Sequence, residues 1–311
     1  MSSPAFEPSY IQTYRQGFLY EKIKKAYRLI QECSLCPRNC GVNRFQEKNG
    51  FCQAGYWPEV SSCAPHFGEE RPLVGSHGSG TIFMTHCNLK CLYCQNYPIS
   101  HKGEGEEISF DKLSQMMLHL QNLGCHNINF VSPSHYVPQI LKSLPPAIEK
   151  GLSVPLVFNT GGYDAFETLK LLEGVFDIYM PDFKYAESRA AERCSGASDY
   201  PQVARMALKE MFRQVGDLYV DDRGVAVKGL LVRHLVLPQE LAHTPKIMHF
   251  LSTEISKNTY VNIMDQYYPC GNIPSGSPLQ RRISRREFKQ AVESAQKEGL
   301  SRLDKKHFRL F

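Results

Sequence analysis

Short apolar runs of strand length alternate with amphipathic stretches through most of the chain. The runs have the length of buried strands, and the stretches between them carry apolar residues at helical spacing. Strands are predicted at Thr81–Thr85, Asn127–Val131, Val154–Asn159, Phe176–Met180, Gly229–Leu237 and Tyr260–Met264. Helices are predicted near residues 110–123, 137–150, 164–174, 200–215, 240–256 and 284–298.

Regular alternation of strand and helix indicates an α/β fold with a parallel sheet joined by right-handed crossovers. Six such units favour a partial (β/α)6 TIM-like barrel over residues 80–311. Periodicity alone leaves a doubly wound open sheet as the alternative. The regular alternation of strands and helices is interrupted between Lys184 and Gly229, where we expect a substrate-facing loop around Ser188–Asp199.

Residues 1–79 are predicted to form an N-terminal helical and cysteine-rich extension. Residues 16–32 carry apolar side chains at helical spacing, which predicts an amphipathic helix packed on the main domain. A cysteine-rich loop follows this helix. Residues 53–79 are rich in Gly, Ser and Pro and are predicted to be a connector.

Composition is typical of a globular protein, with 42% hydrophobic and 22% charged residues among 311. No apolar run approaches the roughly 20 residues that span a bilayer, and Met1–Tyr10 lacks the apolar core of a signal peptide. Eleven cysteines, clustered and odd in number, favour metal-bound thiolates over disulfides. We therefore expect a cytoplasmic protein without a membrane partner.

The net charge of +5 is mild, and basic residues gather toward the C-terminus. This pattern favours a solvated face over a nucleic-acid site. The basic residues concerned are Arg281, Arg282, Arg285, Arg286, Lys305 and Lys306.

The closest cluster of potential metal ligands follows the first predicted strand. It consists of Cys87, Cys91 and Cys94, which are separated by three and then two residues. Zinc sites usually pair separated Cys-x2-Cys units, and ferredoxin-type runs use two-then-two spacing. Three thiolates on a four-iron cluster leave one iron without a protein ligand, and an open metal position can bind substrate. Buried thiols, or a zinc site completed by His86, are the alternatives.

This motif, with Tyr93 before its last cysteine, resembles the signature of radical S-adenosylmethionine (SAM) enzymes. The following Gln95-Asn96 resembles the branch that activates glycyl-radical enzymes such as pyruvate formate-lyase. The resemblance implies a [4Fe-4S] cluster whose open iron binds SAM, and one-electron cleavage of SAM to methionine and a 5′-deoxyadenosyl radical. That radical would take a hydrogen atom from a glycine of a partner protein. The resemblance also implies an electron donor such as flavodoxin or ferredoxin.

Two other activities stay open at this stage. One is the same radical chemistry on a small molecule or on another protein side chain. The other is an iron–sulfur or zinc module for binding or electron transfer, without SAM turnover.

Chemistry in parallel α/β folds gathers at the carboxyl ends of strands. After the second strand, Ser132 stands where many members of the resembled family have Gly-Gly-Glu. The hydroxyl of Ser132 or Ser134 is a candidate acceptor for the ammonium group of SAM. An ordinary turn is the alternative.

The ends of the third and fourth strands resemble the Asp-Thr-Asn-Gly and Asp-Leu-Lys segments of the activating branch. The resemblance implies that Thr160, Asp182 and the Met180 carbonyl hold a monovalent cation beside SAM, with Asn159 replacing an acid. It also implies that Lys184 approaches the SAM carboxylate, as a point charge. A weak surface ion pair is the alternative for Asp182 and Lys184, which share one side of a strand.

The fifth strand carries Arg233 and His234 inside an apolar run. Charge in a buried strand needs a partner, and the resemblance implies a bidentate contact between Arg233 and the SAM carboxylate. A structural arginine satisfied by carbonyls is the alternative. After the sixth strand, Cys270 is a candidate for a substrate-side thiol or for simple packing.

A second cysteine group lies in the extension, in a compact loop with Gly and Pro that needs a metal to hold it. Four thiolates fit structural zinc and a closed iron–sulfur cluster equally well, and a metal-free loop is the third possibility. The group consists of Cys33, Cys36, Cys40 and Cys52. The remaining Cys63, Cys125 and Cys194 are isolated in sequence and are predicted to be small buried side chains.

Overall fold

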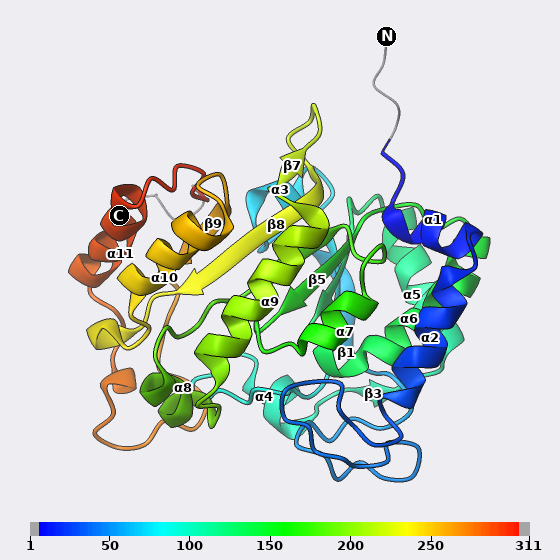
Figure 1. Cartoon of the computed structure of the whole chain (residues 1–311), viewed down its shortest axis with the longest axis horizontal. Coiled ribbons are helices and arrows are strands. Elements are labelled where there is room, and N and C mark those ends of the chain that lie inside the picture. The colour runs from blue at the N-terminus through cyan, green and yellow to red at the C-terminus, as the bar shows by residue number, and fades with distance from the viewer. Residues whose placement is uncertain (1–5, 305–311) are drawn as a thin grey trace.

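Six parallel strands run through the centre of the protein in the order in which the chain makes them. The computed structural model describes residues 6–304. The strands pair successively as β2 (Ser79–Met84), β4 (Ile128–Val131), β5 (Leu156–Thr160), β6 (Ile178–Pro181), β8 (Ala226–Leu235) and β9 (Tyr260–Met264). A doubly wound sheet reverses its strand order at a switch point, whereas this order is sequential. The α/β partial barrel is therefore confirmed (Figure 1).

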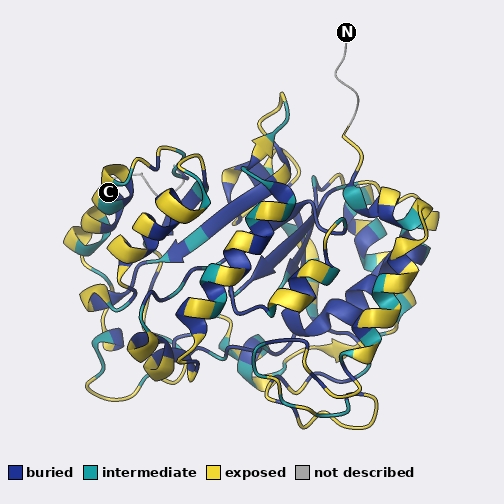
Figure 2. Cartoon of the chain, viewed as in Figure 1, coloured by how far each residue is buried: buried dark blue, intermediate teal, exposed yellow. Residues whose placement is uncertain are grey.

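Amphipathic helices cover the outside of this sheet. Their inner faces are buried and their outer faces are exposed (Figure 2). In α5, Leu113, Met117 and Leu120 are fully buried because they fall on one helical face. The covering helices are α5 (Phe110–Asn122), α6 (Val137–Glu149), α7 (Phe166–Leu171), α9 (Tyr200–Val215), α10 (Thr244–Phe250, extended by a π-helical turn at Leu251–Ile255) and α11 (Arg285–Lys297).

The predicted connector at residues 53–79 is wrong in part. It contains β1 (Glu59–His66), which pairs antiparallel with β2 and carries the short β3 (Glu106–Glu107) on its other edge, and also α3 (Arg71–Val74). β1 has alternating half-exposed residues and therefore lacks the apolar run of a buried strand. Main-chain pairing between β1 and β2 crosses the predicted boundary at residue 79.

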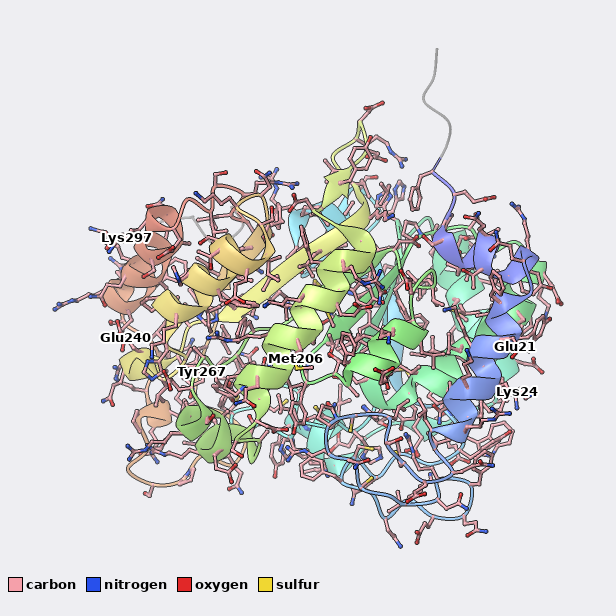
Figure 3. All side chains as sticks on the ribbon, in the orientation of Figure 1. Glu21, Lys24, Met206, Glu240, Tyr267 and Lys297 are labelled. Carbon is pink, nitrogen blue, oxygen red and sulfur yellow. The ribbon has the colours of Figure 1, made fainter. Side chains whose placement is uncertain are left out.

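The N-terminal helix is confirmed but is broken. The structure has α1 (Ser9–Arg15) and α2 (Phe18–Arg28), joined at Gly17, whose φ of +80° ends the first helix. α2 packs on α6 and α7. Glu21 and Lys24 point from its outer face to solvent (Figure 3).

The loop expected around Ser188–Asp199 is largely a helix, α8 (Ser188–Ser195). Its eight residues include only three apolar buried positions, too few to register as a helical pattern. Two further short elements also lacked an apolar signal. These are α4 (Tyr97–Lys102) and β7 (Tyr219–Val220), which pairs antiparallel with β8.

None of the helices in the described part of the chain has the length and apolar character to cross a lipid bilayer. At the C-terminal end, Arg281 pairs with Glu287, and the neighbouring Arg282, Arg285 and Arg286 are exposed. Lys305 and Lys306, and residues Met1 to Ala5 of the expected non-signal N-terminus, lie outside the described residues.

Candidate active site

A cleft of about 210 Å³ opens at the carboxyl ends of the parallel strands. One wall is the loop after β2, residues 86–96, called the cysteine loop below. The other walls are the ends of β4, β5, β6, β8 and β9. The cleft brings together most of the site residues expected at these strand ends, namely Cys87, Cys91, Tyr93, Cys94, Ser132, Thr160, Asp182, Lys184 and Arg233, whereas Ser134 and Cys270 do not line it.

The sulfur atoms of the cysteine loop receive hydrogen bonds from its own backbone. The Leu89 N–H donates to Cys87 Sγ over 3.3 Å, and the Asn96 N–H donates to Cys94 Sγ. Burial raises the pKa of Cys87 to about 12 and also raises the pKa of Cys94. Without a metal these thiols are therefore neutral at pH 7, and a bound metal would stabilise them as thiolates.

Two serine hydroxyls also point at these sulfurs. Ser195 Oγ donates to Cys91 Sγ and Ser100 Oγ donates to Cys94 Sγ, each over 3.1 Å. Ser195 lies 104 residues from Cys91, at the end of α8, so no sequence signal pointed to it. The same helix end places Cys194 against the cysteine loop, because the Leu92 N–H donates to the Cys194 carbonyl over 2.8 Å.

Tyr93 lies beneath the loop and is 4% exposed. Its hydroxyl shares a 2.6 Å hydrogen bond with the hydroxyl of Tyr185, which in turn bonds Ser195 Oγ over 2.8 Å. A chain of three hydroxyl groups therefore runs from Tyr93 to the sulfur of Cys91.

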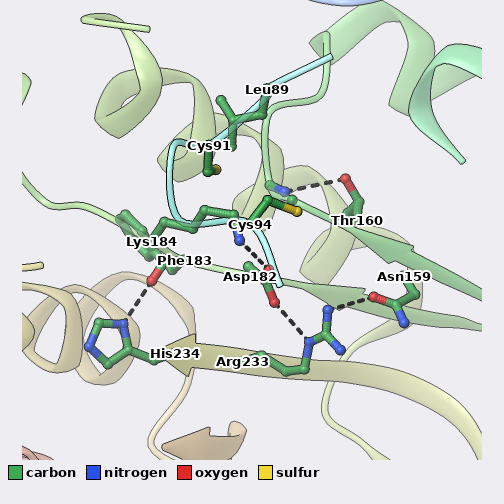
Figure 4. Close-up of polar contacts among 12 residues, drawn as sticks. Leu89, Cys91, Cys94, Asn159, Thr160, Asp182, Phe183, Lys184, Arg233 and His234 are labelled. Atoms are coloured by element: carbon green, nitrogen blue, oxygen red, sulfur yellow. Dashed lines mark hydrogen bonds and ion pairs between the residues drawn. The ribbon is translucent and has the colours of Figure 1, made fainter. Parts of the chain in front are cut away.

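Three charged residues of the cleft, Asp182, Lys184 and Arg233, form one connected group (Figure 4). Asp182 Oδ1 accepts from Arg233 Nε over 2.8 Å, and Asp182 Oδ2 accepts from Lys184 Nζ over 2.5 Å. Burial alone would raise the pKa of Asp182, but Arg233 and Lys184 together lower it, so the carboxylate is ionised. The surface-pair interpretation is wrong, because the side chains of Asp182 and Lys184 are only 13% and 16% exposed.

Arg233 is satisfied by side chains rather than by carbonyls. Besides Asp182, its Nη2 donates to Asn159 Oδ1 over 2.6 Å, and its Nη1 lies 3.9 Å from Glu69 Oε2. Glu69 comes from the stretch predicted as a connector, so sequence analysis missed it. Asn159, which stands in place of an acid, thus positions the arginine of the fifth strand.

Two of the three groups that were expected to bind a monovalent cation, the Asp182 carboxylate and the Thr160 hydroxyl, contact other protein groups instead. Both carboxylate oxygens of Asp182 face cationic side chains, and the Thr160 hydroxyl donates to Asp164 Oδ2 over 2.7 Å. Ser134 Oγ also donates to Asp164, over 2.5 Å. Burial raises the pKa of Asp164 to about 6 despite these two hydrogen bonds. Ser134 therefore has a structural partner, while Ser132 lines the cleft with a φ of +58°.

His234 is a buried structural residue. Its Nδ1 lies 2.8 Å from the Phe183 carbonyl and its Nε2 lies 2.8 Å from Thr244 Oγ1. Burial lowers its pKa to about 4, so the ring is neutral at pH 7. It holds β8 against the segment that carries Asp182 and Lys184.

The loop after β9 packs directly on the cysteine loop. Cys270 Sγ donates to the Tyr93 carbonyl over 3.3 Å, and the Asn272 N–H donates to the Leu92 carbonyl over 2.8 Å. The thiol of Cys270 is therefore engaged with the backbone that carries Cys94.

Gly162 is required where β5 and β6 end side by side. Its φ is +77°, and a Cβ there would lie 2.2 Å from the Asp182 carbonyl oxygen. We expect Gly162→Ala to destabilise the protein by more than Gly224→Ala, whose φ is also +77° but whose Cβ would meet nothing within 4 Å. The shared left-handed backbone costs ~1–2 kcal/mol, and the steric overlap adds ~1–3 kcal/mol. Urea denaturation measures both variants, and equal losses would contradict the crowding at Asp182.

No three His, Cys, Asp or Glu side chains within residues 6–304 are arranged as the ligands of one metal ion. His86 instead lies 3.3 Å from Glu59, so the zinc site completed by His86 is wrong. A four-iron cluster takes each thiolate on a different iron. Three cysteines with hydrogen-bonded sulfurs beside an ammonium group fit such a cluster.

No protein-family model matches the sequence. The chain is similar to the uncharacterized protein MJ0674 of Methanocaldococcus jannaschii, with 31% identity over 313 aligned positions that cover 95% of this chain and 83% of that protein. It is also similar to the uncharacterized protein MJ0808 of the same organism, with 25% identity over 176 positions, 51% of this chain and half of that protein.

Two solved structures share part of the arrangement. HydG, a maturase of the [FeFe]-hydrogenase, matches 72% of this chain with a TM-score of 0.47 and 13% identity, and the chain spans about half of its length, 49%. Methylornithine synthase (PylB) matches 72% of this chain and 63% of its own, with a TM-score of 0.43 and 14% identity. Similarity this low says nothing of the chain's activity.

Proposed function

This chain belongs to the same family as the Methanocaldococcus jannaschii protein MJ0674, and we propose that it is a radical SAM enzyme. The observation that carries the proposal is the position of Cys87, Cys91 and Cys94 on one loop at the carboxyl end of the barrel, facing Lys184 and Arg233 across a cleft. Three thiolates suit a [4Fe-4S] cluster with one iron open to a small ligand. When bound there, the cluster supplies the electron that cleaves SAM to methionine and a 5′-deoxyadenosyl radical.

The residues of the cleft suit the amino-acid end of SAM. The Lys184 ammonium lies beside Asp182 and close enough to Cys94 to lower the pKa of that thiol against the effect of burial. An ammonium there attracts a carboxylate. Ser132, which also lines the cleft, offers a hydroxyl to the ammonium group of SAM.

The proposal is tested by anaerobic reconstitution with iron and sulfide, followed by dithionite and SAM. We expect 5′-deoxyadenosine and methionine in equal amounts, detected by chromatography. Protein incubated without dithionite is the control, because cleavage needs one electron. An absence of 5′-deoxyadenosine from protein that carries iron and labile sulfide would overturn the proposal.

The serine that donates to Cys91 provides a prediction independent of the substrate. A hydrogen bond to a cluster sulfur stabilises the more negative, reduced cluster. We expect Ser195→Ala to shift the reduction potential of this cluster to more negative values, measured by a redox titration followed by electron paramagnetic resonance (EPR). Ser143→Ala is the control, since that hydroxyl donates to the Gln139 carbonyl. An unchanged potential in Ser195→Ala would show that the hydroxyl does not reach a cluster sulfur.

We further propose that the hydrogen atom comes from a glycine of a partner protein, with flavodoxin or ferredoxin as electron donor in the cytoplasm. The support is the resemblance of Gln95-Asn96, of the Asn159–Gly162 segment and of the Asp182–Lys184 segment to the activating branch. Incubation with a glycyl-radical enzyme deuterated at glycine should place deuterium in 5′-deoxyadenosine. Product that stays unlabelled while SAM is cleaved would reject this substrate class.

Ser132, in place of Gly-Gly-Glu, favours a second candidate within the same chemistry. A changed contact to SAM is compatible with a small molecule or another protein side chain as hydrogen donor. Deuterium transfer from labelled candidates into 5′-deoxyadenosine separates the two.

A further inference from the structure

Four cysteines of the N-terminal extension, Cys33, Cys36, Cys40 and Cys52, lie together in the loop that follows α2; they are called the N-terminal thiol group below. This loop lies at the same end of the sheet as α4 and α8 (Figure 1). Three of the four are buried, with exposed fractions of 3% for Cys33, 7% for Cys36 and 5% for Cys52. Disulfides link none of them.

The backbone brings the four thiols together. Cys33 N–H donates to the Val42 carbonyl and the Gly41 N–H donates to the Cys33 carbonyl, which sets the Cys40 segment beside Cys33. Gly50 packs on Cys40, since a Cβ there would lie 3.1 Å from the Cys40 sulfur. The thiols of Cys33, Cys40 and Cys52 all lie close enough to Cys36 for charge on one to act on the other.

Two sulfur atoms of this group, those of Cys33 and Cys36, have the same backbone surroundings as those of Cys87 and Cys94 in the cysteine loop. The backbone N–H two residues further along donates to Cys33 and to Cys36, just as it does to Cys87 and Cys94. These hydrogen bonds stabilise charge on sulfur and tune iron–sulfur clusters.

Arg44 points to an anionic group at this place. It is 2% exposed, and its guanidinium donates to the Ala54 carbonyl, the His135 carbonyl and, over 3.9 Å, the Cys33 sulfur. Within the described part of the chain no carboxylate pairs with it. An unpaired buried cation costs several kcal/mol, whereas four thiolates on a metal centre carry net negative charge.

The loop is also joined directly to the cysteine loop by Arg38, which lies between Cys36 and Cys40. Arg38 Nε donates to the Asn88 carbonyl over 3.0 Å, and Nη2 donates to the Leu89 and Ser195 carbonyls over 3.4 and 2.9 Å. Asn88 and Leu89 lie between Cys87 and Cys91. The two thiol groups are thus held on neighbouring loops with one arginine between them.

We propose that the N-terminal thiol group holds a second iron–sulfur cluster, ligated by all four cysteines, which passes single electrons to the cluster in the cleft. The contacts of Arg38 with the backbone of the cysteine loop suit a redox partner better than a purely structural zinc ion. The second cluster takes one electron from a reduced flavin or iron–sulfur protein, which is oxidised by one electron. It is reoxidised on passing that electron inward, and no bond forms or breaks. This inference rests on the proposed function, because the electron acceptor is the cluster that the proposed function places in the cleft.

Metal and sulfide analysis of anaerobically purified full-length protein tests the second cluster without SAM cleavage. The triple variant Cys87→Ala/Cys91→Ala/Cys94→Ala leaves the N-terminal thiol group intact and should retain about four irons and about four labile sulfides per chain. Wild-type protein should hold twice as much. Zinc without labile sulfide in the triple variant, or no metal in it, would overturn the second cluster. Because no SAM is added, failure here is distinct from failure of the proposed function.

Two further variants test the role of the group. Cys40→Ser, at the least buried of the four positions, should lose about half of the iron and lower the ratio of product made with reduced flavodoxin to product made with dithionite. Arg44→Met should shift the potential of the second cluster to more negative values, since a positive charge next to it is lost. An unchanged ratio would contradict the electron path, and an unchanged potential would contradict Arg44 as the countercharge.

Discussion

Cys94→Ala is expected to reduce 5′-deoxyadenosine formation by more than about 100-fold, since even the outer-shell partners of a metal ligand typically contribute ~10–100-fold. Cys94 lines the cleft, and its sulfur already accepts hydrogen bonds from Ser100 and from the Asn96 N–H. Each thiolate binds one iron, so the two cysteines that remain can bind only two of the four irons of a cluster. The measurement is product formed per chain with dithionite and SAM, together with the iron content.

The matched control is Cys63→Ala, which removes a partly buried thiol of β1 that lies outside the cleft. We expect this variant to keep its iron and its product. Activity in Cys94→Ala equal to that of Cys63→Ala would show that the cleft cysteines are not metal ligands.

Asp182→Asn is expected to destabilise the protein by about 3–5 kcal/mol, the usual cost of removing one partner from a buried ion pair. The carboxylate separates Lys184 from Arg233, and the three side chains are 13%, 16% and 18% exposed. Asparagine keeps the shape but leaves two buried cations facing each other. Urea denaturation of the metal-free protein measures the change without interference from a cluster.

Two controls accompany this variant. Glu167→Gln breaks the exposed pair with Lys170 and should leave the midpoint unchanged. The double variant Asp182→Asn/Lys184→Met removes one of the opposed cations and should recover part of the loss. If Asp182→Asn behaved like Glu167→Gln, the cleft would be far more hydrated than its contacts indicate.

The parallel strands were predictable because each is an apolar run buried on both faces. β9 matches its predicted bounds, Tyr260–Met264, and α9 matches residues 200–215. β1 was missed because half-exposed residues alternate along it and leave no apolar run, and α8 was missed because most of its residues are polar. The helix break at Gly17 depends on one residue in the left-handed region, which a pattern averaged over turns cannot register.

Residues of the cleft on strand ends were predictable since parallel strands bring their carboxyl ends to one edge. Their partners were not. Ser195 reaches Cys91 from a helix 104 residues away, and Glu69 reaches Arg233 from the segment between β1 and α3. Asp164 accepts a hydrogen bond from the Thr160 hydroxyl, which the resemblance assigned to a cation. Such long-range pairings follow from the fold and leave no local trace in sequence.

The central claim is that one iron in the cleft has no protein ligand and binds SAM. EPR spectroscopy of the reduced, reconstituted protein, recorded before and after addition of SAM, tests this most directly, with Cys94→Ala beside it. The account predicts that SAM changes the spectrum of the wild-type cluster and that the change is missing from Cys94→Ala. A reduced cluster whose spectrum is the same with and without SAM would contradict it and would favour a module that only carries electrons.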